Sequence, residues 1–231
     1  MYFRGNMTRI VYKTPDFLIG YKPAGTPSQS DKSGDSDALS ELVQELKRLG
    51  EPSELYLIHR LDRVVGGLLA FARNKKSAAA LSAIVSDGEL CKEYFAVVSG
   101  AAESGEMVDY LIKDATLGKA IVAEQSKKGA KRASLEYKVL DTVTYKGKPI
   151  SLVKIKLHTG RFHQIRAQFS SRGMPLFADK KYGSTHRGQA PALFAFRVAF
   201  DTDSLSCDTS MLPELSEMPW SLFDKEKYVI N

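Results

Sequence analysis

The sequence predicts an α+β fold, with a single domain built on a mostly antiparallel mixed sheet that a few helices and loops flank. Segments with the two-residue alternation of strands outnumber segments with helical spacing. Strands and helices do not alternate regularly, so a parallel sheet of βαβ units is not expected. The 231 residues, 43% of them hydrophobic and 26% charged, are enough for one substantial core.

The N-terminal part of the chain begins with two predicted strands, at residues 10–12 and 17–21. A Thr-Pro-Asp sequence separates them. The next segment, KPAGTP at residues 22–27, is predicted as a non-helical turn, because two prolines and a glycine interrupt any regular element. The chain therefore enters the fold as two short strands followed by an irregular turn.

The predicted helices have recognisable ends. In the first helix, leucine and valine recur at helical spacing, Asp37 is a candidate N-cap and Gly50 follows the last turn. Gly88 and Gly173 end the next two helices. The four predicted helices lie at residues 38–49, 74–88 and 161–173, and within 212–228.

The remaining predicted elements are strands. The segment 133–160 indicates a hairpin, because Val153, Ile155 and Leu157 alternate with lysines after a Lys-Gly-Lys-Pro turn at 146–149. Further strands are predicted at residues 55–58, 68–72, 92–100 and 190–200, with short strands between 107 and 125.

Composition limits the classes of function. The net charge of +6 is compatible with a polyanionic partner. Two cysteines cannot build a disulfide framework, and the four histidines lack metal-ligand spacing, so we expect reduced thiols and no metal. The sequence contains no apolar stretch of about 20 residues and no signal-peptide pattern. We therefore expect a cytoplasmic protein without membrane contact.

Residues 55–74 place His59, Arg60 and Asp62 between two apolar runs. Burying a carboxylate or a guanidinium costs several kcal/mol unless the group is paired and hydrogen-bonded. Either the segment is a tight turn with an Arg–Asp pair on its rim, or the acid is retained for chemistry.

A second segment, at residues 157–183, combines a strand end with a basic helix start. His163 and Arg166 are expected to share a helix face, with Arg161 and Gln164 beside them. Cations and backbone N–H groups at one place suit a carboxylate or a phosphate, although for this stretch alone a solvated helix face is the slightly better explanation. Tyr94, within an apolar strand, has by itself only the signature of a core residue.

Taken together, these segments resemble the RluA family of pseudouridine synthases. The resemblance rests on HRLD at 59–62, KEYFA at 92–96, TGRFHQIR at 159–166 and GMPLFADKKYG at 173–183, and it covers residues 10–200. It implies a catalytic domain at residues 10–231, without an S4 domain. Residues 1–9 are expected to be an N-terminal extension, in which the segment before the second methionine, Met7, is either an alternative start or a run of residues added for expression.

The chain departs from the family pattern in two places. Val65 and Gly66 stand where the family usually has Thr-Ser, and Ala178 stands where it usually has glycine. Asp62 itself is retained, so the expected chemistry remains.

The resemblance implies that the chain isomerises specific uridines in RNA to pseudouridine, with no cofactor. Asp62 is then the essential carboxylate, either as a nucleophile or as a base toward the ribose, and it must be ionised. Arg166 is expected to pair with it, because a planar guanidinium can bind a carboxylate at two points. Tyr94 is expected to stack on the target base and to help remove the proton from C5.

The remaining expected site residues bind the substrate. Arg60 is expected to hold the target nucleotide outside its helix, since the glycosidic bond cannot be reached in a stacked base. His59 is interpreted mainly as structural. The other expected RNA contacts are Arg161, His163, Gln164 and Lys131, and the basic segment of Lys127, Lys128, Lys131 and Arg132 is expected to contact phosphates.

Other classes of function explain less of the sequence. A non-catalytic basic RNA-binding module accounts for the charge but not for Asp62. A metal-dependent nuclease needs clustered carboxylates, and a kinase needs a phosphate-binding loop, and neither is present in the sequence. We expect a monomeric enzyme that acts on ribosomal or transfer RNA.

Overall fold

The computed structural model describes residues 7–202 and 204–229. The chain divides into two compact units: unit 1 is Met1–Lys92 with Ala195–Met211, and unit 2 is Glu93–Phe194 with Leu212–Asn231. Most of the predicted extension at 1–9 lies outside the described residues, and the first strand already begins at Arg9.

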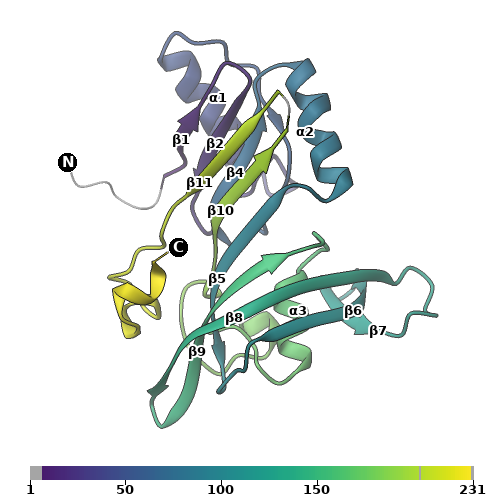
Figure 1. Ribbon diagram of the computed structural model, residues 1–231, viewed down its shortest axis with the longest axis vertical. Helices are drawn as coiled ribbons and strands as arrows, with labels where there is room; N and C mark the ends of the chain where they lie inside the picture. The colour runs from purple at the N-terminus through teal and green to yellow at the C-terminus, as the bar shows by residue number, and fades with distance from the viewer. Residues whose placement is uncertain (1–6, 203, 230–231) are drawn as a thin grey trace. The chain divides into compact units, whose positions relative to one another are not determined.

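Unit 1 is built on antiparallel strand pairs (Figure 1). Four strands lie in the order β1-β2-β4-β10, while β3 pairs with β4 and β11 pairs with β10. The strands are β1 (Arg9–Lys13), β2 (Phe17–Lys22), β3 (Tyr56–Leu57), β4 (Gly66–Ala72), β10 (Leu193–Asp201) and β11 (Ser206–Ser210). The first residues of β10 belong to unit 2.

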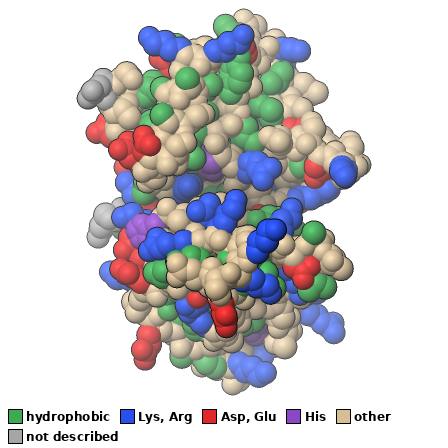
Figure 2. Space-filling view, turned by 90° about the vertical axis from the view of Figure 1, so that its right-hand side faces the viewer, with side chains coloured by type: hydrophobic (Ala, Val, Ile, Leu, Met, Phe, Trp, Pro, Cys, Tyr) green, Lys and Arg blue, Asp and Glu red, His purple; other side chains and the backbone are tan. Residues whose placement is uncertain are grey.

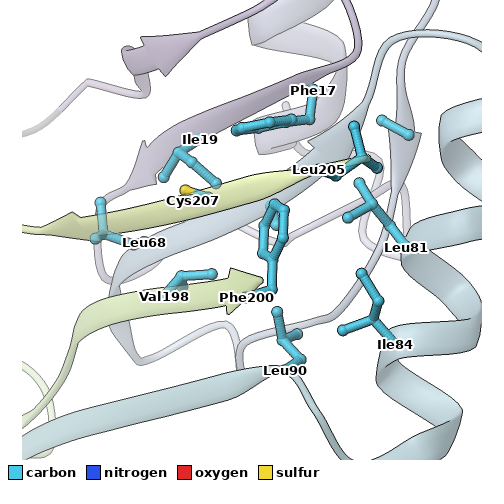
Figure 3. Packing of buried hydrophobic residues seen from close by; sticks show 12 residues of the cluster. Phe17, Ile19, Leu68, Leu81, Ile84, Leu90, Val198, Phe200, Leu205 and Cys207 are labelled. Carbon is cyan, nitrogen blue, oxygen red and sulfur yellow. The ribbon is translucent and has the colours of Figure 1, made fainter. Parts of the chain in front are cut away.

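Two helices cover opposite faces of this sheet. Leu81 and Ile84 of α2 (Lys75–Asp87) pack in a cluster with Phe17 and Phe200, as Figure 3 shows. On the other face, α1 (Ala38–Arg48) brings Leu42 so close to Gly20 that a Cβ there would lie 2.7 Å from the leucine Cδ1. Because β2 and β4 are buried on both faces, their sequences are continuous apolar runs rather than alternating ones.

Unit 2 has five strands in the order β5-β9-β8-β6-β7 and one α-helix among its described residues (Figure 1). Helix α3 packs on the β6–β7–β8 region, where Ala167 and Tyr182 meet Leu111, Ala120 and Ala133. The elements are β5 (Cys91–Ser99), β6 (Gly105–Asp114), β7 (Lys119–Ala123), β8 (Lys131–Tyr145), β9 (Lys148–Leu157), α3 (Gln164–Ser171) and the 3₁₀ turn η1 (Lys180–Tyr182).

The α+β prediction is confirmed, and most element ends agree with it. The Asp37 side chain accepts a hydrogen bond from the Ser40 N–H, and Gly88 ends α2 in the left-handed conformation. The helix predicted from residue 161 begins only at Gln164, because the φ of His163 is 51° and no helical residue adopts that angle.

The prediction of a short C-terminal helix was wrong in kind. The segment forms two 3₁₀ turns, η2 (Trp220–Leu222) and η3 (Lys225–Tyr228). The Tyr228 hydroxyl donates a hydrogen bond to the Trp220 carbonyl (2.9 Å), and its ring packs edge-on against Phe95. The contacts of one buried tyrosine therefore determine the conformation of this segment, and the helical spacing of its apolar residues does not.

Gly67 lies at a close approach between β4 and β10. Its φ is +132°, and a Cβ built there would lie 2.3 Å from the Ala195 carbonyl oxygen and 2.6 Å from its nitrogen. Both atoms belong to the backbone, so they cannot rotate away. Gly67, at the start of β4, is therefore required by backbone contact in this chain.

Gly67→Ala is expected to lower the free energy of unfolding by at least about 3 kcal/mol, because the methyl group overlaps backbone and the conformation is unfavourable for alanine. Urea titration followed by circular dichroism measures the change. Gly105→Ala is the matched control, since a Cβ there meets only the Tyr137 hydroxyl at 4.0 Å. Equal stability of the two variants would contradict the close approach.

Candidate functional site

Asp62 lies in the loop between β3 and β4, and it is half-buried. The Val65 N–H donates a hydrogen bond to the Asp62 carbonyl oxygen (3.0 Å), which makes a tight turn at the acid. One residue earlier, Leu61 exchanges two bonds with Ser28: the serine hydroxyl donates to the Leu61 carbonyl (2.9 Å) and accepts from its N–H (3.1 Å). The irregular turn at 22–28 thus holds the loop that carries the acid.

Arg63, on the other side of Asp62, makes a second connection to the same turn. The Gly25 N–H donates to the Arg63 carbonyl (2.8 Å), and the Arg63 Nε donates to the Gly25 carbonyl (2.9 Å). The guanidinium also forms an ion pair with Asp35. Both neighbours of Asp62 are therefore fixed by hydrogen bonds to one segment of unit 1.

Lys22, at the end of β2, has no exposed surface. Its ammonium donates to three backbone carbonyls, those of Thr26 (2.7 Å), Pro23 (3.0 Å) and Arg63 (3.2 Å). Burial lowers the pKa of Lys22 to about 7, and the negative charge of Asp62 acts against that shift. By the same interaction, a protonated Lys22 stabilises the ionised form of Asp62.

His59 ends the β3–β4 ladder with a side chain in place of a backbone acceptor. The Ile58 N–H donates to the Ala70 carbonyl (3.1 Å), and the Ala70 N–H donates to the His59 Nε2 (3.2 Å). Burial lowers the pKa of His59 to about 3, so the ring is neutral and the lone pair of Nε2 can accept this bond. This bond supports the structural interpretation of His59.

Arg60 is the exposed side chain between His59 and the acid. Among the residues that the structure describes, it has no hydrogen bond and no ion pair. Its guanidinium is free to bind an external group, which is what a substrate contact requires.

In unit 2, Arg166 forms a bidentate pair with Asp179. The Nε donates to Oδ2 (2.7 Å) and the Nη2 donates to Oδ1 (2.9 Å), and both residues are buried. The guanidinium also lies 4.9 Å from the centre of the Tyr182 ring. Asp62 belongs to the other unit, so the pairing of Arg166 with Asp62 stays a prediction, and the partner found within unit 2 is Asp179.

His163 and Tyr182 connect α3 to β7. The His163 Nδ1 and the Tyr182 hydroxyl lie 3.0 Å apart, and the hydroxyl accepts a hydrogen bond from the Ala120 N–H (2.8 Å). Burial, followed by the charges of Arg166 and Lys181, lowers the pKa of His163 to about 3. The histidine is therefore neutral, and its ring nitrogen takes part in an internal hydrogen bond.

Gln164 is buried at the start of α3, and its amide is used inside the protein. Its Oε1 accepts from the Thr159 hydroxyl (2.7 Å) and from the Arg161 N–H (3.0 Å), while its Nε2 donates to the Ser134 carbonyl (3.1 Å). These bonds fix the TGR turn. They favour a structural role for Gln164 over the predicted contact with substrate.

The other predicted site residues of unit 2 differ in exposure. Tyr94 is buried in β5, opposite Ile155 of β9. Arg161 is exposed, and its Nε donates to the Arg132 carbonyl (2.9 Å), while Lys131 is exposed at the start of β8. Arg161 and Lys131 can reach an external anion, whereas Tyr94 presents little surface.

Sequence reasoning missed four residues of these two networks: Lys22, Ser28, Asp179 and Tyr182. A lysine that ends an apolar strand and precedes Pro-Ala-Gly was the available signal for Lys22. Asp179 and Tyr182 lie in the GMPLFADKKYG segment, but no local pattern connects them to Arg166.

Two further expectations concern ligands and membranes. Within the described ranges, no group of three or more His, Cys, Asp or Glu residues has the arrangement of a metal site. No helix among those residues is long and apolar enough to cross a membrane.

Comparison with known proteins identifies the family. Residues 16–171 match the family model described as RNA pseudouridylate synthase. The chain belongs to this family. The RluA-type resemblance of its motifs is thereby confirmed.

Members of the RNA pseudouridylate synthase family resemble the chain over most of its length. An uncharacterized RNA pseudouridine synthase of Zymomonas mobilis is 35% identical over 76% of this chain and 78% of its own length. The tRNA pseudouridine synthase C of Haemophilus ducreyi is 32% identical over 78% and 76%. An uncharacterized RNA pseudouridine synthase of Aquifex aeolicus is 32% identical over 75% of this chain, but that match spans only 55% of the Aquifex protein.

The solved structure of human RNA pseudouridylate synthase domain containing 1 has the same fold. It superposes with a TM-score of 0.75 over 93% of this chain and 86% of the human one, at 24% identity. Human RNA pseudouridylate synthase domain containing 4 gives a TM-score of 0.73 over 89% of each chain, at 20% identity. At these identities the likeness shows the fold alone.

Ser28→Ala is expected to lower the free energy of unfolding by about 1–3 kcal/mol, because it leaves both the N–H and the carbonyl of buried Leu61 without their partner. Thermal or urea unfolding measures this loss. Ser82→Ala, on an exposed position of α2, is the control and should change stability by less than about 0.5 kcal/mol. A Ser28 variant as stable as the control would show that the loop does not depend on this clamp.

His59→Gln is expected to remove a pH dependence of stability while keeping an acceptor for the Ala70 N–H. The folded pKa of about 3 lies below the unfolded value of about 6.5, so the unfolded chain binds more protons between these pH values. Protonation of His59 should therefore lower the free energy of unfolding of the wild type by about 1 kcal/mol for each pH unit as the pH falls below about 6.5.

Urea titrations at a series of pH values from neutral to mildly acidic measure this slope. His158→Gln, at an exposed histidine, is the control and should keep the wild-type slope. If His59→Gln also keeps it, the imidazole is not the neutral acceptor described above.

Proposed function

We propose that the protein isomerises uridine to pseudouridine in structured RNA, with Asp62 as the essential carboxylate. The observation that carries the proposal is the support of Asp62, a half-buried acid on a loop held by Ser28 and by the buried ammonium of Lys22. Placing two charged groups in a poorly hydrated region is costly. In a member of the RNA pseudouridylate synthase family, that cost has a chemical use.

The reaction breaks the C1′–N1 bond of the uridine and forms a C1′–C5 bond after the uracil has rotated. N1 gains a proton and C5 loses one, so the reaction is an isomerisation that needs no oxidant or reductant. Asp62 either attacks the sugar and later leaves, or removes a proton from the ribose. Both roles need an ionised carboxylate, which Lys22 favours.

The residues of unit 2 are proposed to complete the site. Tyr94 stacks on the target base and assists loss of the C5 proton, and Arg166 supports the carboxylate of Asp62. The bidentate bond to Asp179 fixes the plane of the Arg166 guanidinium. The group is then already oriented for a second carboxylate, which we propose is that of Asp62.

Phosphate contacts are proposed for the exposed cations. Arg60 has a free guanidinium and holds the target nucleotide in its extruded form. Lys127, Lys128, Lys131 and Arg132 form an exposed basic segment in and before β8. The RNA is proposed to be ribosomal or transfer RNA, as the names of two relatives suggest. One is the tRNA pseudouridine synthase C of Haemophilus ducreyi, and the other is the ribosomal large subunit pseudouridine synthase D of Zymomonas mobilis.

A non-catalytic RNA-binding module is the alternative. It gives the basic surface a purpose, but it requires neither the acid nor the three-carbonyl site of Lys22. The same RNA preparation separates the two functions, because only the enzyme releases tritium from C5-labelled uridine.

Asp62→Asn is expected to abolish tritium release from C5-labelled RNA and to leave the binding constant within a few-fold of the wild type. The substitution is nearly isosteric, but asparagine is neither a carboxylate nucleophile nor a base. RNA binding depends mainly on phosphate contacts and base stacking. Tritium release and filter binding at fixed salt are the two measurements.

Asp87→Asn, an exposed residue at the end of α2, is the control and should keep wild-type tritium release. Tritium release by Asp62→Asn at the wild-type rate would remove Asp62 from the mechanism and with it the proposed function.

A further inference from the structure

Phe162 is an exposed aromatic ring on a basic part of unit 2. Phe162 is 38% exposed, and among the Phe, Tyr and Trp residues that the structure describes, the other exposed one is Tyr12, at 47%. Phe162 directly precedes His163 and α3. A large apolar ring beside water is stabilised when a flat ligand covers it.

The backbone at His163 turns the two neighbouring rings onto each other. The φ of His163 is 51°, a conformation that costs a non-glycine residue about 1–2 kcal/mol. As a result the rings of Phe162 and His163 stack with their centres 3.8 Å apart and their planes 19° from parallel. His163 is in turn held by Tyr182, at 3.0 Å from its hydroxyl. One side of Phe162 therefore rests on a fixed aromatic support.

One cation contacts this ring, and two others lie close to it in the chain or act on the neighbouring His163. The Lys113 ammonium lies over the Phe162 ring, 4.8 Å from its centre, in a cation–π contact that a long, flexible side chain can give up. Lys181 donates to the Gly118 carbonyl (3.1 Å), and Arg161 donates to the Arg132 carbonyl (2.9 Å). Among the described residues, none of Lys113, Lys181 and Arg161 forms an ion pair, so their charges are available to an anion. Figure 2 shows Lys and Arg side chains on the exposed surface of this unit, in the lower part of the view.

We propose that Phe162 is a stacking platform for an unpaired base of the RNA, which displaces the Lys113 ammonium from the ring onto one adjacent phosphate while Arg161 contacts another. A flat, unpaired base matches the supported ring, and the phosphates on each side of it match the unpaired cations. A purely apolar partner would leave those charges buried and uncompensated. This inference rests on the proposed action on RNA and adds a second contact, to a base other than the target uridine.

The probe is a short single-stranded RNA in which one base at a time is replaced by 2-aminopurine, a fluorescent base that is quenched when it stacks. Wild-type protein should quench it at one position. Phe162→Ala should lose that quench and weaken binding by about 5- to 150-fold, the usual range for losing one aromatic–base stack. Phe162→Tyr should retain both, because the ring remains.

Two control variants separate stacking from charge and from folding. Tyr12→Ala removes the other exposed aromatic ring and should leave the quench and the affinity unchanged. Lys113→Ala should keep the quench but reduce the slope of log K against log salt by about 0.7, the value of one phosphate contact on a single strand. Phe162→Ala should still unfold in one cooperative transition above the temperature of the binding assay, so that a loss of binding is not a loss of the fold.

The outcomes are distinguishable from those for the proposed function. If wild type releases tritium from C5-labelled RNA and Phe162→Ala keeps the quench and the affinity, the platform is refuted and the enzyme stands. If wild type releases no tritium but Phe162→Ala loses the quench, the platform stands and the enzyme is refuted. If Phe162→Ala leaves RNA binding intact and changes the oligomeric state, the ring is a contact between copies, and the inference is overturned.

Discussion

The buried ammonium of Lys22 is the interaction on which the acidic loop depends. It donates to carbonyls on its own turn, at Pro23 and Thr26, and to Arg63, 41 positions further along the chain. Three acceptors are what an ammonium with three donors needs when it is removed from water. The bond to Arg63 places a cation beside the backbone of Asp62, and the interaction of the two charges offsets part of the cost of burying either one.

The turn that supplies these acceptors is irregular for a related reason. Prolines at 23 and 27 lack an N–H, and Gly25 adopts a φ of 97°, so the carbonyls can point inward rather than along a ladder. Ser28 then donates to and accepts from the Leu61 backbone. The loop that carries Asp62 therefore takes its hydrogen bonds from this turn rather than from a regular element. Within the loop, Arg60 is exposed and Asp62 is half-buried.

In unit 2 the buried cation, Arg166, is paired with a carboxylate rather than with backbone carbonyls. Arg166 is neutralised by Asp179 through two parallel bonds, and Tyr182 lies against the guanidinium. Ala178, just before Asp179, has a φ of 64°, a left-handed conformation in which alanine costs about 1 kcal/mol more than glycine. The chain keeps this strained alanine where the family pattern usually has glycine, and the neighbouring ion pair holds the segment in place.

The sequence by itself determined the features that depend on nearest neighbours. Asp37 and Gly88 identified two helix ends because capping bonds form within four residues, and the Lys-Gly turn identified the β8–β9 hairpin. The order of the motifs also determined the family, and with it the candidate acid Asp62. Helical spacing overextended α3 and suggested a C-terminal helix, since periodicity does not report the φ of one residue or the anchoring of one tyrosine.

Only the tertiary structure decided which groups meet. Arg166 forms an ion pair with Asp179, and His163 stacks on Phe162. The amide of Gln164 forms hydrogen bonds with Thr159 and Ser134. Lys22 lies buried under a loop that is distant in sequence. Burial and hydrogen bonding of a polar side chain depend on what the rest of the fold brings to it, and no local pattern contains that information.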